Sequence, residues 1–247
     1  MRFYIIALQF LTIIPLPFSV RCEQEDLGRS TACFPLAGVT IGALLAGVNW
    51  LLAPWLARPL CDALLIAALA ALTGGLHLDG LADVCDGLAA RGGRERFLAV
   101  MKDSHVGAIG AAGLALCLLL KWQALVAVPG GIKWQALLIF PALARFGQAL
   151  ALTGARHARQ DGLGAAFVQG AGGGALFLAF IIAAVSACLL GYKGLLALAA
   201  VGLFTCAGRL FFQRRLGGLT GDTVGCLSEL NEIIALLIMS SAPHIIS

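Results

Sequence analysis

Three aspartates within one short segment have the chemistry and the spacing of a cation site. Asp79, Asp83 and Asp86 stand at positions i, i+4 and i+7 of the segment 74–87. On an α-helix they fall within roughly 60° of one another, and we call them the carboxylate stripe. Clustered carboxylates repel one another, and a divalent cation relieves that repulsion. Because carboxylate oxygens are ligands of hard cations, the stripe predicts a Mg²⁺ site.

Two other interpretations of the stripe stay open. Acidic residues favour the start of a helix, so the segment also fits a solvated helix face. A softer metal held by His77 and Cys85 is the second alternative. His77 would lie about 160° from Asp79 if the helix extended back to it. We therefore expect His77 before the helix start, near the substrate, where His77 or Asp83 is a candidate proton acceptor.

A second cluster occupies the segment 101–110, where Lys102, Asp103 and Ser104 precede two glycines. Lys102 can meet a phosphate as a point charge, which makes it a candidate both for substrate binding and for catalysis. Asp103 can add a metal ligand, and Ser104 can bind substrate. Gly107 and Gly110 allow close approach of the backbone. An ordinary loop before a hydrophobic span explains the segment equally well.

Two further clusters lie in the second half of the chain. The glycine-rich segment 217–225 contains Thr220 and Asp222 and leads toward Glu229, which we expect at the beginning of a span. Such loops before helices bind phosphate, so Thr220 and Glu229 are candidate substrate-binding residues and Asp222 a metal ligand. A turn with capping residues is the alternative. The fourth cluster, at 156–164, offers Arg159 for substrate binding, and a basic loop that only sets topology explains it too.

The elements that position these clusters must lie in a membrane. Of the 247 residues, 60% are hydrophobic and 12% are charged, and the mean hydropathy is +0.93. A soluble domain has about 25% charged residues, so this chain is predicted to be an integral membrane protein of one domain over residues 1–247. This composition excludes a secreted disulfide scaffold and a conventional soluble enzyme. We expect the eight cysteines to be reduced and packed among apolar side chains.

Apolar runs of sufficient length predict an all-α, polytopic bundle of about seven transmembrane helices. The expected spans are Phe34 to Ala57, Leu60 to Leu76, Val106 to Val128, Lys133 to Leu152, Ala175 to Leu190, Leu195 to Phe212 and Leu230 to Ile246. The apolar start, Phe3 to Phe18, is shorter and contains two prolines, so we expect an interfacial or re-entrant helix. Arg145 falls inside a span and needs an internal partner or a path to water.

Charge divides unequally between the two faces that these spans define. Most arginines fall in the N-terminal segment and in the connections after the second, fourth and sixth spans. The other face receives Arg58, Lys133 and Lys193, with Lys121 near its end of the third span. The positive-inside rule makes the arginine-rich face cytoplasmic. Of the 13 acidic residues, only Asp62 is expected on the other face, so the candidate active-site loops should all face the cytoplasm.

The segments 74–87, 101–104 and 218–222, in this order, resemble the cobalamin synthases, also called adenosylcobinamide-GDP ribazoletransferases. The resemblance runs nearly end to end and includes the start of the chain (8–17), the segment 158–164 and the segment 229–232. It implies transfer of the adenosylcobinamide phosphate group of adenosylcobinamide-GDP to α-ribazole or its 5′-phosphate, with release of GMP, as the last assembly step of cobalamin. It also implies that Mg²⁺ would hold the diphosphate. The protein itself would lie in a bacterial cytoplasmic (inner) membrane. The sequence departs from the family at His105, usually arginine, and at His157, commonly tyrosine.

Two other functions remain as alternatives. A membrane CDP-alcohol-type phosphotransferase or prenyltransferase also uses carboxylates and Mg²⁺, although the full CDP-alcohol spacing is missing here. An ion-coupled transporter would place its ionisable residues near the midplane, whereas these are expected at one face. Membrane lipid is an expected partner, and nucleic acid is not, because the net charge of +4 is spread over loops without a basic tract. The sequence leaves open an oligomer, the preferred lower base and the identity of the general base.

Overall fold

The computed structural model describes residues 1–15, 23–158, 167 and 170–241, and within these ranges the chain is helical without a β-sheet. The helices are α1 (Arg2–Leu11), α2 (Gln24–Ser30), α3 (Phe34–Leu52), α4 (Arg58–Leu72), α5 (Leu76–Ala89), α6 (Arg94–Val100), α7 (Ala108–Ala127), α8 (Lys133–Leu152), α10 (Gly173–Cys188), α11 (Gly191–Leu216) and α12 (Gly221–Ser240). This confirms the prediction of an all-α bundle.

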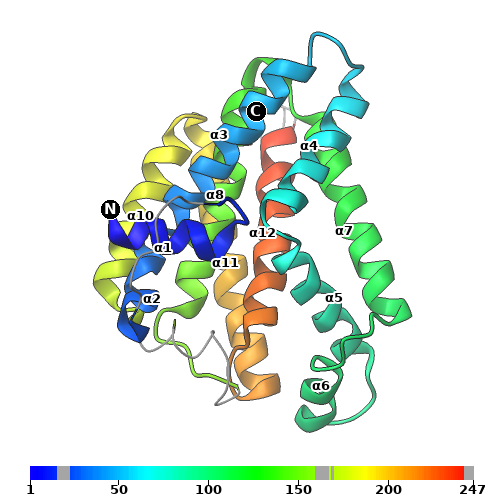
Figure 1. Ribbon diagram of the computed structural model, residues 1–247, viewed down its shortest axis with the longest axis vertical. Coiled ribbons are helices and arrows are strands. Elements are labelled where there is room, and N and C mark those ends of the chain that lie inside the picture. Colours follow the sequence, from blue (N-terminus) through cyan, green and yellow to red (C-terminus); the bar gives the residue numbers. More distant parts are fainter. Residues whose placement is uncertain (16–22, 159–166, 168–169, 242–247) are drawn as a thin grey trace.

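Five of the described helical segments are long and apolar enough to cross a membrane, and the bent pair α4–α5 raises the number to six if it forms one span. The segment with α10 coincides with the expected fifth span, but α10 has only 16 residues. Helix α12 runs through the middle of the bundle, with α4, α5 and α7 on one side and α3, α8 and α10 on the other (Figure 1). The polytopic architecture expected from the apolar runs is therefore present.

The second expected span, Leu60 to Leu76, ends in a sharp turn. Helix α4 ends at Leu72, and α5 leaves it at 90°. Gly74 and Gly75 have φ angles of +61° and +70°, a left-handed conformation that glycine adopts without steric cost. Their N–H groups donate to the carbonyl oxygens of Ala71 (3.0 Å) and Ala70 (2.9 Å), which closes the end of α4. The turn starts a new helix that contains the carboxylate stripe.

Close approach of backbones holds the centre of the bundle together. Gly38 and Gly42 of α3 lie against the backbone of α8, where a Cβ at Gly38 would come within 2.6 Å of the Pro141 carbonyl oxygen. Helix α8 is buried along most of its length and packs on both α3 and α12. Small residues at a helix interface allow this packing in a membrane, where apolar surfaces alone give no driving force between helices.

The last span begins earlier than expected. Helix α12 starts at Gly221, nine residues before the expected Leu230, so the expectation that Glu229 lies where a span begins is wrong. The side chain of Thr220 accepts a hydrogen bond from the Thr223 N–H (3.2 Å), and Thr223 Oγ1 accepts one from the Thr220 N–H (2.9 Å). This capping box supplies a helix start that local hydrophobicity does not reveal.

The described parts of the four candidate clusters gather toward one end of the bundle. The connection from α5 through α6 to α7, residues 153–158 after α8 and the turn between α11 and α12 all lie in the lower part of the view (Figure 1). This arrangement agrees with the assignment of these connections to a common face. Helix α1 crosses the bundle at a steep angle to α3 and α12 (Figure 1). It is shorter than the expected segment Phe3 to Phe18, whose end lies outside the described residues.

Candidate functional site

The carboxylate stripe lies on α5 as its spacing predicts. Asp79 is exposed and Asp83 is half-buried, whereas His77 is only 3% exposed and faces the interior. The opposite placement of His77 and Asp79 follows from the angle between them on the helix. Our expectation that His77 precedes the helix is wrong, because α5 begins at Leu76 and includes it. The two sides of α5 therefore lie in different environments, since Asp79 is on the exposed side and His77 is on the side that faces the interior of the bundle.

Asp86 joins the stripe to the second cluster. Its two carboxylate oxygens accept hydrogen bonds from the backbone N–H groups of Gly107 (2.7 Å) and Gly110 (2.8 Å). These groups belong to the start of α7 and have no partner within that helix. A carboxylate at a helix N-terminus also interacts favourably with the helix dipole. Asp86 thus anchors α7 and places the loop that contains Lys102 beside the stripe.

Gly80 joins the stripe to the third cluster. A Cβ at this position would lie 2.7 Å from the carbonyl oxygen and 2.8 Å from the Cα of Asp222. The first turn of α12 therefore rests directly on α5, one turn from Asp83. Asp222 is half-buried there, and Thr220, which is 3% exposed, uses its side chain for the helix cap. The structure brings the carboxylate-bearing parts of the first and third clusters together.

Backbone hydrogen bonds join the third cluster to the fourth. The N–H of Ala158 donates to the Leu219 carbonyl (3.0 Å), and the N–H of Leu219 donates to the Arg156 carbonyl (2.8 Å). Arg94 of α6 donates to the carbonyl oxygens of Leu216 (2.6 Å) and Ala158 (2.8 Å), so it ties α6 to both segments. Arg159, the expected substrate-binding residue of this cluster, lies outside the described residues.

The loop between α6 and α7 presents exposed polar side chains. Lys102, Asp103, Ser104 and His105 are all exposed. The ring Nδ1 and the backbone N–H of His105 lie 2.7 Å and 3.1 Å from Asp103 Oδ1. These hydrogen bonds lower the pKa of Asp103 below its ordinary value of 3.8. At neutral pH the loop therefore offers one ammonium group and one ionised carboxylate to a ligand.

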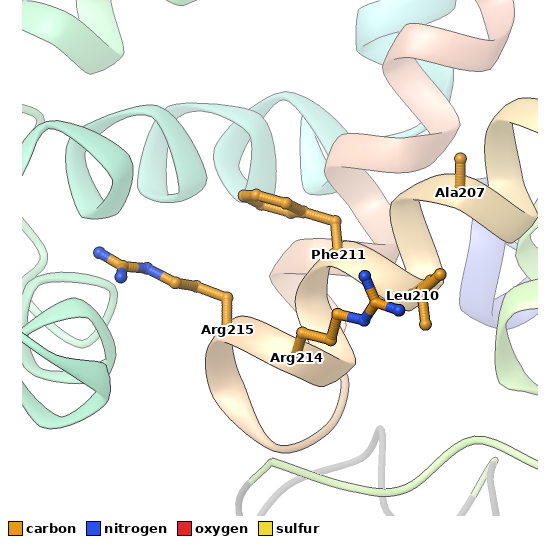
Figure 2. A pocket seen from close by; sticks show the side chains of 5 residues that line it. All are labelled: Ala207, Leu210, Phe211, Arg214 and Arg215. Carbon is orange, nitrogen blue, oxygen red and sulfur yellow. The ribbon is translucent and has the colours of Figure 1, made fainter.

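A hollow at the end of α11 adds two arginines to this end of the bundle. It has a volume of about 390 Å³ and is lined by Ala207, Leu210, Phe211, Arg214 and Arg215. Arg215 extends away from α11, while Arg214 lies beside Leu210 (Figure 2). Arg215 also donates to the Gly92 carbonyl at 3.4 Å, in the segment between α5 and α6. The hollow combines an apolar wall with a cationic rim.

The middle of the bundle contains a buried ion network that joins α7, α8 and α12. Lys121 of α7 lies 2.6 Å from Glu229 and is also paired with Glu232. Glu232 is paired in addition with Arg145, whose Nη1 lies 3.3 Å from Ser228 Oγ. All four charged side chains are at most 4% exposed. Their charges sum to zero, as a low-dielectric environment requires.

The network shows that Lys121 lies in a place other than the one expected from the sequence, and it also contains Arg145 and Glu229. Lys121 was expected near the opposite face, but it is buried against α12 and pairs with two glutamates. Arg145 has the internal partner that its place in a span demands. Arg145 and Glu229, both expected to bind substrate, lie inside the network and not among the exposed side chains of the four clusters. Asp62 does lie at the other end, paired with Arg58 and Lys133 (3.1 Å).

Sequence reasoning missed Lys121 and Glu232 as functional candidates. The signal was present, since both are charged residues within apolar runs and Glu232 follows Glu229 by three positions, on the same helix face. Lys121, Arg145 and Glu232 are all charges within expected spans, so each of them needs an internal partner. Pairing of Lys121 and Arg145 with the acids of α12 meets this need, whereas Lys133 of α8 pairs with Asp62.

The donor chemistry of the stripe region fits Mg²⁺. In the described part of the chain, no three His, Cys, Asp or Glu side chains form a ready cage for a metal. Mg²⁺ does not need one, because it is commonly bound by one or two carboxylates together with substrate phosphates and water. Asp79 is exposed, and Asp83 and the adjoining Asp222 are half-buried. These three residues present hard oxygen ligands on neighbouring surfaces of α5 and α12.

Comparison with known proteins gives one consistent result. The profile of the family described as cobalamin-5-phosphate synthase matches residues 3–240. An adenosylcobinamide-GDP ribazoletransferase of Geotalea daltonii is 58% identical over 96% of this chain and 96% of its own length. Another, from a Roseiflexus species, is 38% identical over 96% of this chain and 89% of its own length. A third, from Pseudomonas aeruginosa, is 39% identical over 97% and 98%. No solved structure matches the chain significantly.

Proposed function

Because the chain belongs to the cobalamin-5-phosphate synthase family, we propose that it is an adenosylcobinamide-GDP ribazoletransferase, the enzyme named for its relatives. It transfers the adenosylcobinamide phosphate group to α-ribazole or to α-ribazole 5′-phosphate. The ribose 3′-hydroxyl oxygen forms a bond to the phosphorus attached to the corrinoid side chain. The bond from that phosphorus to the bridging oxygen breaks, GMP leaves, and the hydroxyl proton passes to a base. The near full-length match is the observation on which this proposal depends.

We assign the Mg²⁺ ligands to the carboxylates of α5 and α12. Asp79, Asp83 and Asp222 would hold the ion, which when bound neutralises the diphosphate and stabilises the departing GMP. Asp103 is the further candidate ligand of the α6–α7 loop. Asp86 contributes by holding the start of α7, since both of its oxygens already accept backbone N–H groups. These residues would fix the position of the diphosphate above the first turn of α12.

The same end of the bundle supplies positive charge for the phosphates. Lys102 is exposed in a loop that Asp86 holds beside the stripe. A phosphoryl-transfer site mainly positions its reactants and neutralises developing charge, which suits an ammonium at this place. Ser104, two residues further, can donate a hydrogen bond to a phosphate oxygen. Arg159 belongs to the fourth cluster and remains our candidate for a second phosphate contact.

Asp83 is our candidate for the group that accepts the hydroxyl proton, through the carboxylate oxygen that does not hold the ion. It is half-buried on the stripe and therefore lies on the side of α5 that the substrates can reach. A carboxylate is a competent general base when it lies within hydrogen-bond reach of the proton it takes. The buried position of His77 separates it from this side of the helix.

We place the protein in the bacterial inner membrane, with the four clusters in the cytoplasm. The reason is the excess of arginine in the connections at that end of the bundle. The hollow on α11 then lies at the membrane surface, and its apolar wall and two arginines suit the headgroup and upper chain of an anionic phospholipid. Adenosylcobinamide-GDP and α-ribazole would reach the site from the cytoplasm.

Release of GMP by the purified protein in detergent tests this function. We expect GMP and the cobalamin product to appear in equal amounts from adenosylcobinamide-GDP and α-ribazole. CDP-diacylglycerol and a prenyl diphosphate, offered with suitable acceptors, test the alternative phosphotransferase and prenyltransferase activities. A transporter would require a sealed membrane, so turnover in micelles separates transferase from transporter. Turnover of either lipid substrate without GMP release would contradict the proposal.

A further inference from the structure

On the buried face of α5, His77 makes a specific polar contact with another helix. His77 Nδ1 lies 3.5 Å from Nη2 of Arg145, at the long limit of a hydrogen bond. A guanidinium only donates, so this contact assigns the acceptor role to Nδ1 and the proton to Nε2. The structure gives His77 Nε2 no hydrogen-bond partner among the described residues. His77 therefore contacts the network through one nitrogen and projects no group to the exposed side of the helix.

A chain of polar contacts runs from α5 to α12 through Arg145. The two oxygens of Glu232 are divided between two cations, since Oε1 meets Arg145 and Oε2 meets Lys121. Glu229 gives Lys121 a second carboxylate at 2.6 Å. The position of the Arg145 guanidinium is thus set by α12, and the guanidinium in turn faces His77. Buried charges in such a network tolerate little displacement, because losing one partner leaves another charge uncompensated.

The network and the carboxylate stripe are attached to the same two helices. Asp222 rests against Gly80 at the start of α12, and Gly225 lies one turn further along, against His77, where a Cβ would be 3.3 Å from the His77 Cα. Rotation of α5 about its axis would move His77 away from Arg145 and would move Asp79 and Asp83 relative to Asp222. The contact on the buried face therefore restricts the geometry of the carboxylates on the exposed face.

We propose that His77, Arg145 and Glu232 are positioning residues that hold α5 in the rotation at which its aspartates and Asp222 share one cation. This inference rests on the proposed function, because it concerns the same cation. His77 thereby has a role other than the proton acceptor expected from the sequence. Lys121 holds the second oxygen of Glu232. Glu229 in turn pairs with Lys121 and supplies the second negative charge that the two cations of the network require.

Two substitutions of His77 separate positioning from proton transfer. His77→Asn retains an acceptor oxygen close to the place of Nδ1, whereas His77→Leu removes it. We expect His77→Leu to weaken the binding of Mn²⁺ to the detergent-purified protein about tenfold, the loss typical of outer-shell partners of metal ligands, while His77→Asn stays close to wild type. Mn²⁺ binding is measured without substrates from the loss of the free-ion electron paramagnetic resonance signal.

Arg145→Lys supplies an independent test of the same contact. The lysine preserves a charge for Glu232 but lacks the planar fork that also faces His77. We expect its Mn²⁺ affinity to fall as in His77→Leu, and the double variant to bind no more weakly than either single one, because both remove one interaction. Asp62→Asn is the matched control. It removes a buried, paired carboxylate at the other end of the bundle, so it should lower thermal stability and leave Mn²⁺ binding unchanged.

The outcomes distinguish this inference from the proposed function. Wild-type Mn²⁺ affinity in His77→Leu and Arg145→Lys, or an equal loss in Asp62→Asn, would overturn the positioning role. Loss of GMP release in both His77 variants with unchanged Mn²⁺ binding would also overturn it and would restore His77 as the proton acceptor. A wild-type protein that binds no Mn²⁺ but releases GMP would overturn the inference while leaving the transferase activity established.

Discussion

Gly80 of α5 lies directly against the backbone of Asp222 at the start of α12. A methyl group at Gly80 would lie 2.7 Å from the Asp222 carbonyl oxygen, and both partners are backbone atoms or attached to them, so neither can swing aside. Residues 142 positions apart in the sequence thus meet where the two helices bring carboxylates together. Loss of this contact should separate the first cluster from the third.

Gly80→Ala should therefore lose most of its activity even though alanine favours helix by about 1 kcal/mol. The reason is that α5 and α12 must move apart to admit the methyl group. GMP release and thermal unfolding of the purified variant measure the effect. Gly202→Ala is the matched control, since Gly202 lies within α11 with nothing near its Cβ position. It should be as active as wild type and as stable or more so. Equal behaviour of the two variants would contradict the packing argument.

Tags in the 87–100 and 213–216 segments should report the same side of the membrane. Both segments lie at the end of the bundle that holds the clusters, and Arg215 of one donates to Gly92 of the other. From the positive-inside rule we expect that side to be the cytoplasm. A tag near Lys193, at the start of α11, should report the periplasm. If the first two tags reported opposite sides, the clusters would not share one face of the membrane and the proposed site would be wrong.

Asp86→Asn should destabilise the protein, whereas Asp79→Asn should not. Asp86 accepts two backbone N–H groups of α7, and an amide can accept through only one of its two atoms. The expected loss is about 1 kcal/mol in free energy of unfolding, as for other helix caps. Thermal unfolding in detergent measures it. Asp79 is exposed, so the same chemical change there should reduce activity at wild-type stability. If the two variants melted alike, the anchoring role of Asp86 would be wrong.

The pKa of Asp103 should rise when His105 is removed. Two hydrogen bonds from His105 hold that pKa below 3.8. A lowered folded-state pKa means that this contribution to stability is present above 3.8 and is lost as the pH falls through the lowered value. His105→Ala should return the pKa toward 3.8. Carboxyl ¹³C resonances of aspartate-labelled protein, with Asp103→Asn for assignment, report the titration. An unchanged midpoint would show that His105 does not stabilise the carboxylate.

Local sequence patterns predicted the elements whose causes are local. The apolar runs located most of the spans, and Asp79, Asp83 and Asp86 lie on one helix as their spacing predicted. The 90° turn at Gly74 and Gly75 was not predicted, because the apolar run of the second expected span continues across both glycines to Leu76. The start of α12 was also missed. Its capping box lies in a polar segment, before the apolar run from which the span was predicted.

Interactions between distant residues could not be read from the sequence. The pairing of Lys121 with two glutamates more than 100 residues away depends on which faces of α7 and α12 meet. The anchoring of α7 by Asp86 likewise requires knowledge that the start of α7 returns to α5. Three aspartates with the same role were expected. In the structure Asp79 is exposed and Asp83 is half-buried, whereas Asp86 accepts backbone hydrogen bonds from the start of α7. The residue types therefore indicated a cation site, but the separate role of Asp86 became visible only in the folded structure.

Magnesium titrations of Lys102→Ala and Asp222→Asn test most directly the claim that these two loops bind phosphate and metal respectively. Lys102 is an exposed ammonium, so Lys102→Ala should slow transfer or weaken substrate binding without changing the Mg²⁺ concentration for half-maximal GMP release. Asp222→Asn should need more Mg²⁺ and recover in part at high concentration, because saturation can restore metal occupancy but not a lost phosphate contact. If added Mg²⁺ rescued Lys102→Ala and left Asp222→Asn inactive, the assignment of the two loops would be reversed.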